Sequence, residues 1–287
     1  MATANMKDVK RRIKSVESTM QITKAMQLVA SSKLRRAKDR AVAAQPFFQT
    51  LYDTMCDISA DYNFTSVFTK KKFLNSTLLV VIAGDRGLAG GFNHNVLKMA
   101  QEEADKILAT GGELRVMAIG KKAVEFFEKR SYNLTDKYPG IAETITTDDM
   151  MDIAEIIVER FRSRDFDKVE LVYTTFVSAM TQEPMKLQIL PVENLDKAKK
   201  TNAATIYDPS PEEVFDGMIP DYIGGMLYSA ILDSFASEQA SRRTAMESAT
   251  DNAGEMIDKL SLLYNRARQA QITQEITEIS SASIGRE

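Results

Sequence analysis

The sequence predicts an α/β protein in which two long helices, one at each end of the chain, pair as an antiparallel coiled coil. Three observations predict this class: an apolar seven-residue repeat near the start, the same repeat near the end, and apolar strands alternating with helices between them. We divide the 287 residues into a helix over 1–60, an α/β domain over 75–195 and a helix over 208–287.

The first repeat fills the N-terminal helix. Alternating steps of four and three residues meet an apolar side chain at thirteen of fifteen positions. Those positions are Val9, Ile13, Val16, Met20, Thr23, Gln27, Ala30, Leu34, Ala37, Ala41, Ala44, Phe48, Leu51, Met55 and Ile58. A repeat this regular is typical of a coiled-coil seam. Pro46 lies inside it and is expected to kink or break the helix.

The second repeat begins after Pro211 and is most regular near the end of the chain. The regular positions are Met246, Ala249, Ala253, Met256, Leu260, Leu263, Ala267 and Ala270, after which the apolar residues change phase. Seventy residues of helix would be about 105 Å long, several times the diameter of the middle domain. The N-terminal helix is the expected partner, and a bundle folded back on the middle domain is the alternative.

The middle of the chain alternates between strands and helices. Strands are expected at 76–84, 113–120, 168–177 and 184–192, and helices at 93–110, 121–130 and 148–164. Such alternation is typical of a layered α/β domain with a mostly parallel sheet. Residues 196–210 are expected to be a linker.

Composition narrows the possible classes. No apolar run approaches the roughly 20 residues that span a bilayer, since the longest is Leu78 to Ala83. The single cysteine, Cys56, excludes an internal disulfide. The net charge is −3, but the first forty residues carry +8 and the rest −11. That basic helix could meet an acidic protein, nucleic acid or an anionic membrane, or simply be solvated.

The segment "AGDRGLAGG", residues 83–91, joins the first strand to a helix, where glycines often hold phosphate. Its spacing matches neither the dinucleotide fingerprint nor the Walker loop, and Asp85 would repel a phosphate. A tight turn with one or two residues at positive φ is the better-supported interpretation.

No residue set in the sequence has the composition of an active site. His94 opens a predicted helix and is expected at the surface, and Cys56 lies beside the seam and is expected to be packed. The acidic pairs Asp148–Asp149 and Glu212–Glu213 are adjacent, so each pair points to different sides of a helix. We therefore predict no catalytic residue, cofactor or metal.

Four motifs occur together in this chain. They are "ITKAMQLVASSKLRRA", "DRGLAGGFN", "ASEQASRRTAMESATDNA" and "YNRARQAQITQEITEI". Their order and spacing resemble the gamma subunits of bacterial F-type ATP synthases over essentially the whole chain. The resemblance implies a Rossmann-like domain at the base of a central shaft formed by the two terminal helices.

The resemblance also implies the partners and the role. Three alpha and three beta subunits would surround the shaft, and its foot would rest on the epsilon subunit and the membrane c ring. Ion-driven rotation would then change the conformation of the catalytic beta subunits. The expected location is the cytoplasmic face of a bacterial membrane, reached through the c ring.

For residues that match the family motifs, the resemblance also implies contacts with other subunits. Those expected to meet the beta subunit are Met26, Lys33, Arg35, Arg36, Arg86, Ala89, Arg268, Gln269 and Thr273. Tyr207 is expected near the c ring or epsilon. Two alternatives remain: a nucleotide-binding enzyme, suggested only by the glycine turn, and a nucleic-acid-binding coiled coil, suggested by the basic helix. The basic helix has no aromatic residue before Phe47 on which bases could stack.

Overall fold

The computed structural model describes residues 6–60, 64–70, 76–141, 143–193, 195 and 206–284. Most of the predicted linker, residues 196–205, lies outside this part. The chain divides into two units. Unit 1 joins the residues up to Ala30 to those from Arg242 onward, and unit 2 is Ser31–Ser241.

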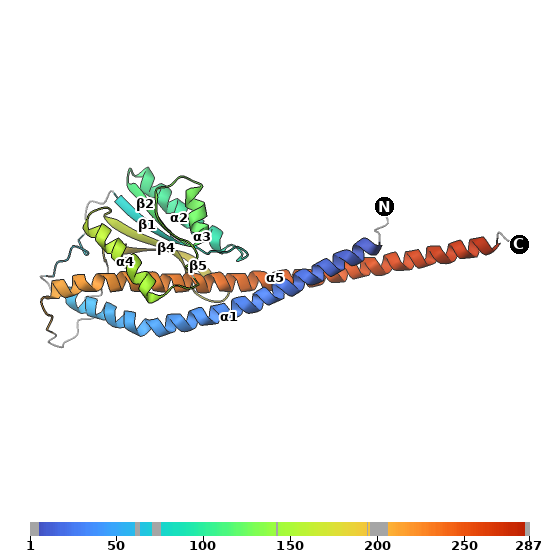
Figure 1. Cartoon of the computed structure of the whole chain (residues 1–287), viewed down its shortest axis with the longest axis horizontal. Helices are drawn as coiled ribbons and strands as arrows, with labels where there is room; N and C mark the ends of the chain where they lie inside the picture. Colours follow the sequence, from blue (N-terminus) through green and yellow to red (C-terminus); the bar gives the residue numbers. More distant parts are fainter. Residues whose placement is uncertain are drawn as a thin grey trace. The chain divides into compact units, whose positions relative to one another are not determined.

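Ten elements follow one another along the chain (Figure 1). They are α1 (Met6–Ser59), β1 (Ser76–Ile82), α2 (Phe92–Ala109), β2 (Glu113–Ile119), α3 (Lys121–Glu128), β3 (Leu134–Tyr138), α4 (Thr147–Arg162), β4 (Lys168–Phe176), β5 (Gln182–Leu190) and α5 (Pro211–Ile284). Every helix and strand expected from the sequence is present. The strand β3 was not predicted, because its residues "LTDKY" are never fully buried and include charged side chains.

The strands of unit 2 form one sheet in the order β3-β2-β1-β4-β5. The pairs β1–β2, β1–β4 and β2–β3 are parallel, and β5 pairs with β4 in the antiparallel sense. The prediction of a mostly parallel sheet is confirmed. The parallel part with its crossover helices is the Rossmann-like arrangement that the resemblance implied.

The two faces of the sheet support two separate apolar cores. Along β1, Leu78, Val80 and Ile82 belong to the core that α4 and α5 cover. The alternate residues Leu79 and Val81 belong to the core beneath α2 and α3. Because side chains alternate across a strand, a strand buried on both faces appears as a continuous apolar run.

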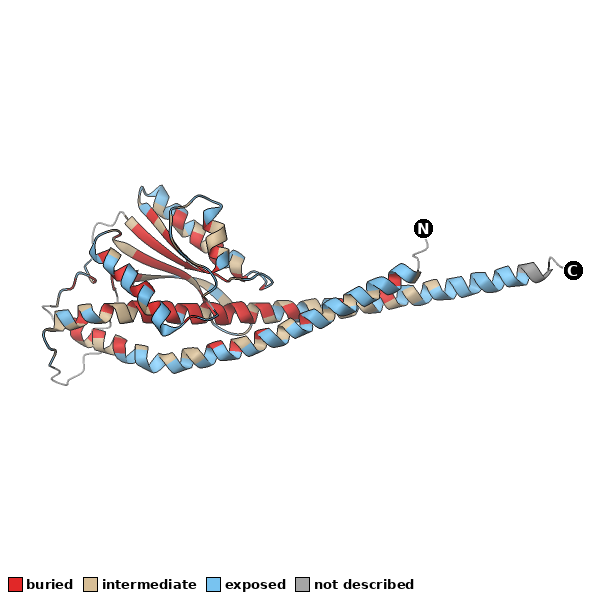
Figure 2. Cartoon of the chain, in the orientation of Figure 1, coloured by how far each residue is buried: buried red, intermediate tan, exposed pale blue. Residues whose placement is uncertain are grey.

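The N-terminal seam is confirmed along its whole length. All fifteen predicted positions are buried or half-buried, while most of their neighbours up to Leu51 are exposed (Figure 2). In unit 1, Thr23 Oγ1 lies 2.7 Å from Thr250 Oγ1 on α5. In unit 2, Phe48 packs against Gly225, and Arg40, eight residues earlier on α1, bonds to Tyr228, three residues later on α5. The two helices therefore run antiparallel.

The C-terminal seam was predicted in the wrong phase at three positions. Met256 and Leu263 are 44% and 50% exposed, and Ala270 is also exposed. Their neighbours Ile257 and Tyr264 are half-buried instead. Each error lies where two apolar residues are adjacent or where the paired segment ends, so the pattern alone does not choose between steps of three and four.

Pro46 does not end α1, so of the two predicted effects, a kink or a break, the break does not occur. The helix continues through it to Ser59. Pro46 is exposed, and its carbonyl accepts a hydrogen bond from Thr50 Oγ1 at 3.0 Å. The packing of the residues on either side of Pro46 against α5 holds the helix together where one backbone hydrogen bond is missing.

The middle of α5 is buried almost all round, which the sequence did not predict. Between Ala230 and Ala240 only Asp233 is not fully buried. Two serines in this segment bond to the sheet: Ser234 Oγ accepts from Thr174 N at 3.1 Å, and Ser237 Oγ donates to Thr174 O at 3.4 Å. These bonds satisfy hydroxyl groups that would otherwise be costly to bury.

Candidate functional site

The loop after β1 is held by one carboxylate. Asp85 Oδ1 accepts hydrogen bonds from Lys121 N, at the start of α3, and from Gly140 N, after β3, each at 2.8 Å. Ligands of doubly wound sheets bind at this carboxyl edge, and phosphates bind backbone N–H groups there. The chain's own carboxylate uses two of those donors, which disfavours the phosphate interpretation further.

The same loop is a tight turn, as predicted. Leu88 has a φ of 61° and Gly90 a φ of 53°, so two residues adopt the left-handed conformation. Asn93 then fixes the turn from α2. Its Oδ1 accepts from Gly84 N at 2.8 Å, and its Nδ2 donates to Arg86 O at 3.1 Å. The loop therefore has a fixed shape.

The fixed shape decides which side chains of the loop can reach a partner. Arg86 is exposed, as its predicted role requires. Ala89 is only 2% exposed, so its methyl group packs inside the chain, and its contact with the beta subunit stays a prediction. Leu88 is 65% exposed and presents an apolar group that the sequence analysis did not single out. An alanine between leucine and glycine carries no signal that its methyl group points inward.

The basic residues of α1 fall into two groups. Arg35 and Arg36 are exposed, as expected for contacts with a partner. Lys33 instead binds Glu143 within the chain, with its Nζ 2.6 Å from Oε1 and 2.8 Å from Oε2. Met26 is half-buried in unit 1. Lys33 therefore serves first to hold α1 against the loop before α4.

Two further cations of α1 have the same internal role and were missed. Arg40 donates to the carbonyl oxygens of Glu143 and Ile145 and, at 3.3 Å, to Tyr228 Oη on α5. Lys38 Nζ lies 4.2 Å from the ring centre of Phe176 at the end of β4. Part of the positive charge of the first forty residues is thus used to attach α1 to unit 2.

The third group of predicted residues lies at the end of α5. Arg268, Gln269 and Thr273 are exposed, as is every residue over 268–280 (Figure 2). Within this stretch, Thr273 Oγ1 donates to Gln269 O at 2.9 Å, so its hydroxyl is bonded inside the helix. Ile272, Ile276 and Ile279 form an exposed apolar stripe, with exposed fractions of 46%, 59% and 70%.

Tyr207 lies just before α5 and is half-buried against the core beneath α4 and α5. Part of its ring is therefore accessible, and its contact with the c ring or epsilon stays a prediction. The predicted residues are divided between the two units. Met26, Arg268, Gln269 and Thr273 belong to unit 1, and the others belong to unit 2.

The residues considered for chemistry have structural positions. His94 is exposed and Cys56 is fully buried, as expected. Asp149 forms a capping box with Thr146 at the start of α4, and this hydrogen bonding lowers the pKa of the Asp149 carboxyl. Across the described residues, no three His, Cys, Asp or Glu side chains are grouped so as to hold a metal ion.

No helix in the described part of the chain has the length and apolar character needed to cross a bilayer.

Comparison with known proteins agrees with this architecture. The ATP synthase family model matches residues 5–283. The ATP synthase gamma chain of Ruminococcus albus is 73% identical over 281 residues, which cover 98% of each chain. That of Alkaliphilus metalliredigens is 44% identical over 285 residues, which cover 97% of each.

A solved structure shows the same fold. It is a chain of the central stalk and c ring of the mitochondrial ATP synthase of Tetrahymena thermophila, with a TM-score of 0.60 and 25% identity. The match covers 79% of this chain and 99% of that chain. Because sequence similarity extends over almost the full length and the fold agrees, the chain belongs to the family of ATP synthase gamma chains.

Proposed function

We propose that this chain is the central rotor shaft of an F-type ATP synthase and has no active site of its own. It would couple ion-driven rotation of the c ring to conformational change at the catalytic beta subunits. The observation that carries this proposal is the 73% identity over nearly the whole length to a gamma chain. The match covers 98% of this chain and 98% of the relative.

The exposed end of α5 supports the proposal. An apolar stripe on a helix surface favours contact with another protein, and Ile272, Ile276 and Ile279 are each at least 46% exposed. A ring of surrounding subunits is a partner of suitable geometry. Switching a catalytic site from 1:99 to 99:1 requires a preference of about 5.5 kcal/mol, which packing and a few charged contacts can supply.

Within this role, the exposed cations are the proposed contacts with acidic groups of beta. These are Arg35 and Arg36 on α1, Arg86 in the loop after β1, and Arg268 beside Gln269 on α5. The guanidinium group binds carboxylates through two parallel hydrogen bonds, so it suits such contacts better than an ammonium group. Tyr207 is the proposed neighbour of epsilon or the c ring.

The assembly is the first test. A tagged copy of the chain is expressed in its source cells together with its native partners. It is expected to co-purify with three alpha chains, three beta chains and epsilon for each copy of the tagged chain. Membrane association is expected to depend on the c ring. A different stoichiometry, or recovery of the chain alone, would rule out the rotor.

The second test concerns Arg268 and Gln269. Replacing both with alanine should leave the complex assembled but lower ATP synthesis and coupled hydrolysis about tenfold or more, since roughly 1.4 kcal/mol of contact energy is worth one factor of ten. The matched control replaces the exposed neighbours Arg266 and Gln271 with alanine and should retain turnover. Equal losses in the two variants, or none in either, would refute the role of this pair.

A further inference from the structure

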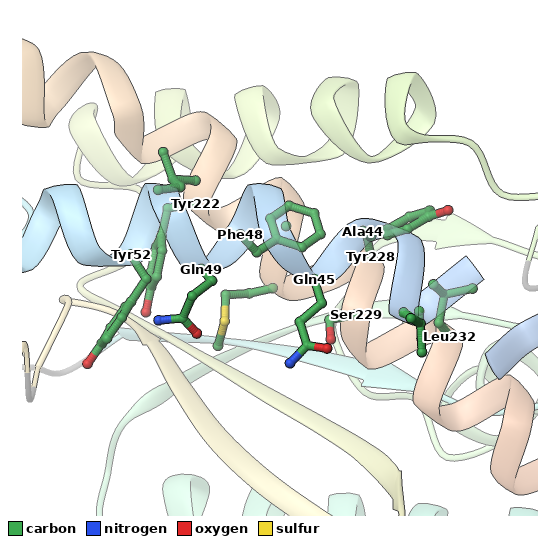
Figure 3. Close-up of a pocket in the computed structure, with 14 residues that line it drawn as sticks. Ala44, Gln45, Phe48, Gln49, Tyr52, Tyr222, Tyr228, Ser229 and Leu232 are labelled. Atoms are coloured by element: carbon green, nitrogen blue, oxygen red, sulfur yellow. The ribbon is translucent and has the colours of Figure 1, made fainter. Parts of the chain in front are cut away.

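A groove between α1 and α5 lies within unit 2 and is not explained by any contact described above (Figure 3). Its volume is about 460 Å³. Residues of α1 between Ala41 and Tyr52 form one wall, and residues of α5 between Tyr222 and Leu232 form the other. A volume of this size is within the range of about 300–1,000 Å³ that is typical of small-molecule sites.

The lining is aromatic and uncharged. None of the fourteen residues around the groove is acidic or basic, and four are Phe48, Tyr52, Tyr222 and Tyr228. Burial, together with the nearby Tyr52, raises the pKa of Tyr222 to about 12, so this phenol is neutral at physiological pH. Gln45 and Ser229 are exposed and add an amide and a hydroxyl. The groove thus offers π faces and neutral hydrogen-bonding groups.

The floor of the groove depends on a glycine. A Cβ placed on Gly225 would lie 2.2 Å from Cε1 of Phe48, so the ring lies directly against the backbone of α5. A second cavity of about 270 Å³ is also lined by Phe48, Gly225 and Tyr228. The Phe48 ring therefore lines both spaces, and its position affects how much room a molecule would have in each.

We propose that this groove binds one uncharged, flat, largely aromatic molecule that carries a hydroxyl or carbonyl group. The aromatic part would stack on Phe48 and the tyrosine rings, and the polar group would bond to the Gln45 amide or the Ser229 hydroxyl. An ionised ligand would lose hydration without gaining an opposite charge, so the lining selects against it. The occupant would bridge α1 and α5.

Two dyes with one scaffold test both the site and its charge preference. N-phenyl-1-naphthylamine is uncharged, and 8-anilinonaphthalene-1-sulfonate adds a sulfonate to the same ring system. With the full-length chain, the neutral dye should show saturable fluorescence at one site per chain. The anionic dye should bind at least about tenfold more weakly, a difference of about 1.4 kcal/mol. Equal affinity, or no saturation by the neutral dye, would refute the proposal.

Filling the groove should abolish the signal. Ser229→Trp on α5 and Val42→Trp on α1 each place an indole at the groove from an exposed position. Each should weaken the neutral dye about tenfold or more, while Ser18→Trp, at an exposed helical serine outside the groove, should not. Circular dichroism and melting temperature confirm folding of each variant. Loss of binding in all three, or retained binding in both groove variants, would place the dye elsewhere.

Discussion

At the scale of single residues, Asp233 is the exception in an otherwise buried stretch of α5. Its Oδ2 accepts a hydrogen bond from Thr175 Oγ1 on β4 at 3.3 Å. Burial raises the pKa of the Asp233 carboxyl, and the bond from Thr175 offsets this only in part. The charged form of this side chain therefore destabilises the folded chain relative to the neutral form.

A pH dependence of stability follows from this shift. The folded state holds the Asp233 proton more tightly than the unfolded state, so stability is lost as pH rises from about 3.8 through the raised pKa. Asp233→Asn removes this loss. As pH rises from about 3.8 to the raised pKa of Asp233, the melting temperature of the Asp233→Asn variant should exceed that of the wild type by a growing amount. Above that pH range the difference should stay constant.

Thr175→Val provides the matched comparison. It removes the hydrogen bond that favours the charged carboxylate, so the loss of stability with rising pH should become larger. Thermal melts of the three proteins across acidic and neutral pH measure both effects. If the difference in melting temperature between Asp233→Asn and the wild type were the same at every pH, Asp233 would not be the source of the pH dependence.

At the scale of elements, two adjacent glycines of α5 allow close packing against α1 and against α4. Gly225 allows the Phe48 ring to reach the backbone of α5, and Gly224 similarly leaves room for Met151 Sδ, 2.9 Å from where a Cβ would lie. Cation contacts from Lys33, Lys38 and Arg40 add specific attachments to α1, as described above. In unit 2, α1 is therefore held by close apolar packing against α5 and by basic side chains that contact the loop before α4, the end of β4 and Tyr228 of α5.

Gly225→Ala tests this packing. The new methyl group would overlap Phe48, and overpacking of this kind costs about 1–3 kcal/mol of folding free energy. Gly217→Ala is the control, because no atom lies within 4 Å of its Cβ position and alanine favours a helix by up to about 1 kcal/mol. Urea unfolding should show opposite shifts in midpoint for the two variants. A stabilised Gly225→Ala would mean that the ring moves aside freely.

At the scale of the whole molecule, the regular parts of the sequence predicted the fold well and the irregular parts did not. The N-terminal seam was predicted correctly because its seven-residue spacing continues over fifteen positions, which fixes the phase even where apolar residues are adjacent, as at Val29–Ala30 and Phe47–Phe48. The C-terminal seam failed where Met256 and Ile257, and then Leu263 and Tyr264, are adjacent, since either residue of each pair satisfies the pattern. β3 was missed because its stability comes from pairing with β2 rather than from its own residues.

The candidate contacts were predicted less completely for a related reason. A sequence motif indicates which residues are shared with a family, but it does not show what each side chain contacts within the chain. Ala89 points inward, and Lys33 is bound by Glu143, which is 110 residues away. Arg40 and Leu88 received no assignment, because neither the internal bonds of Arg40 nor the exposure of Leu88 is encoded in local spacing.

The exposed end of α5 has a consequence for motion. Its polar side chains bond along their own helix: Gln271 to Glu275 and Gln274 to Glu278, each at 2.9 Å, and Thr277 to the Thr273 carbonyl at 2.8 Å. The isoleucine stripe remains for neighbouring subunits, and apolar contacts have no preferred direction. In the proposed rotor, the isoleucine stripe would move past its surroundings without hydrogen bonds of its own to break, and the directional contacts would be left to Arg268 and Gln269.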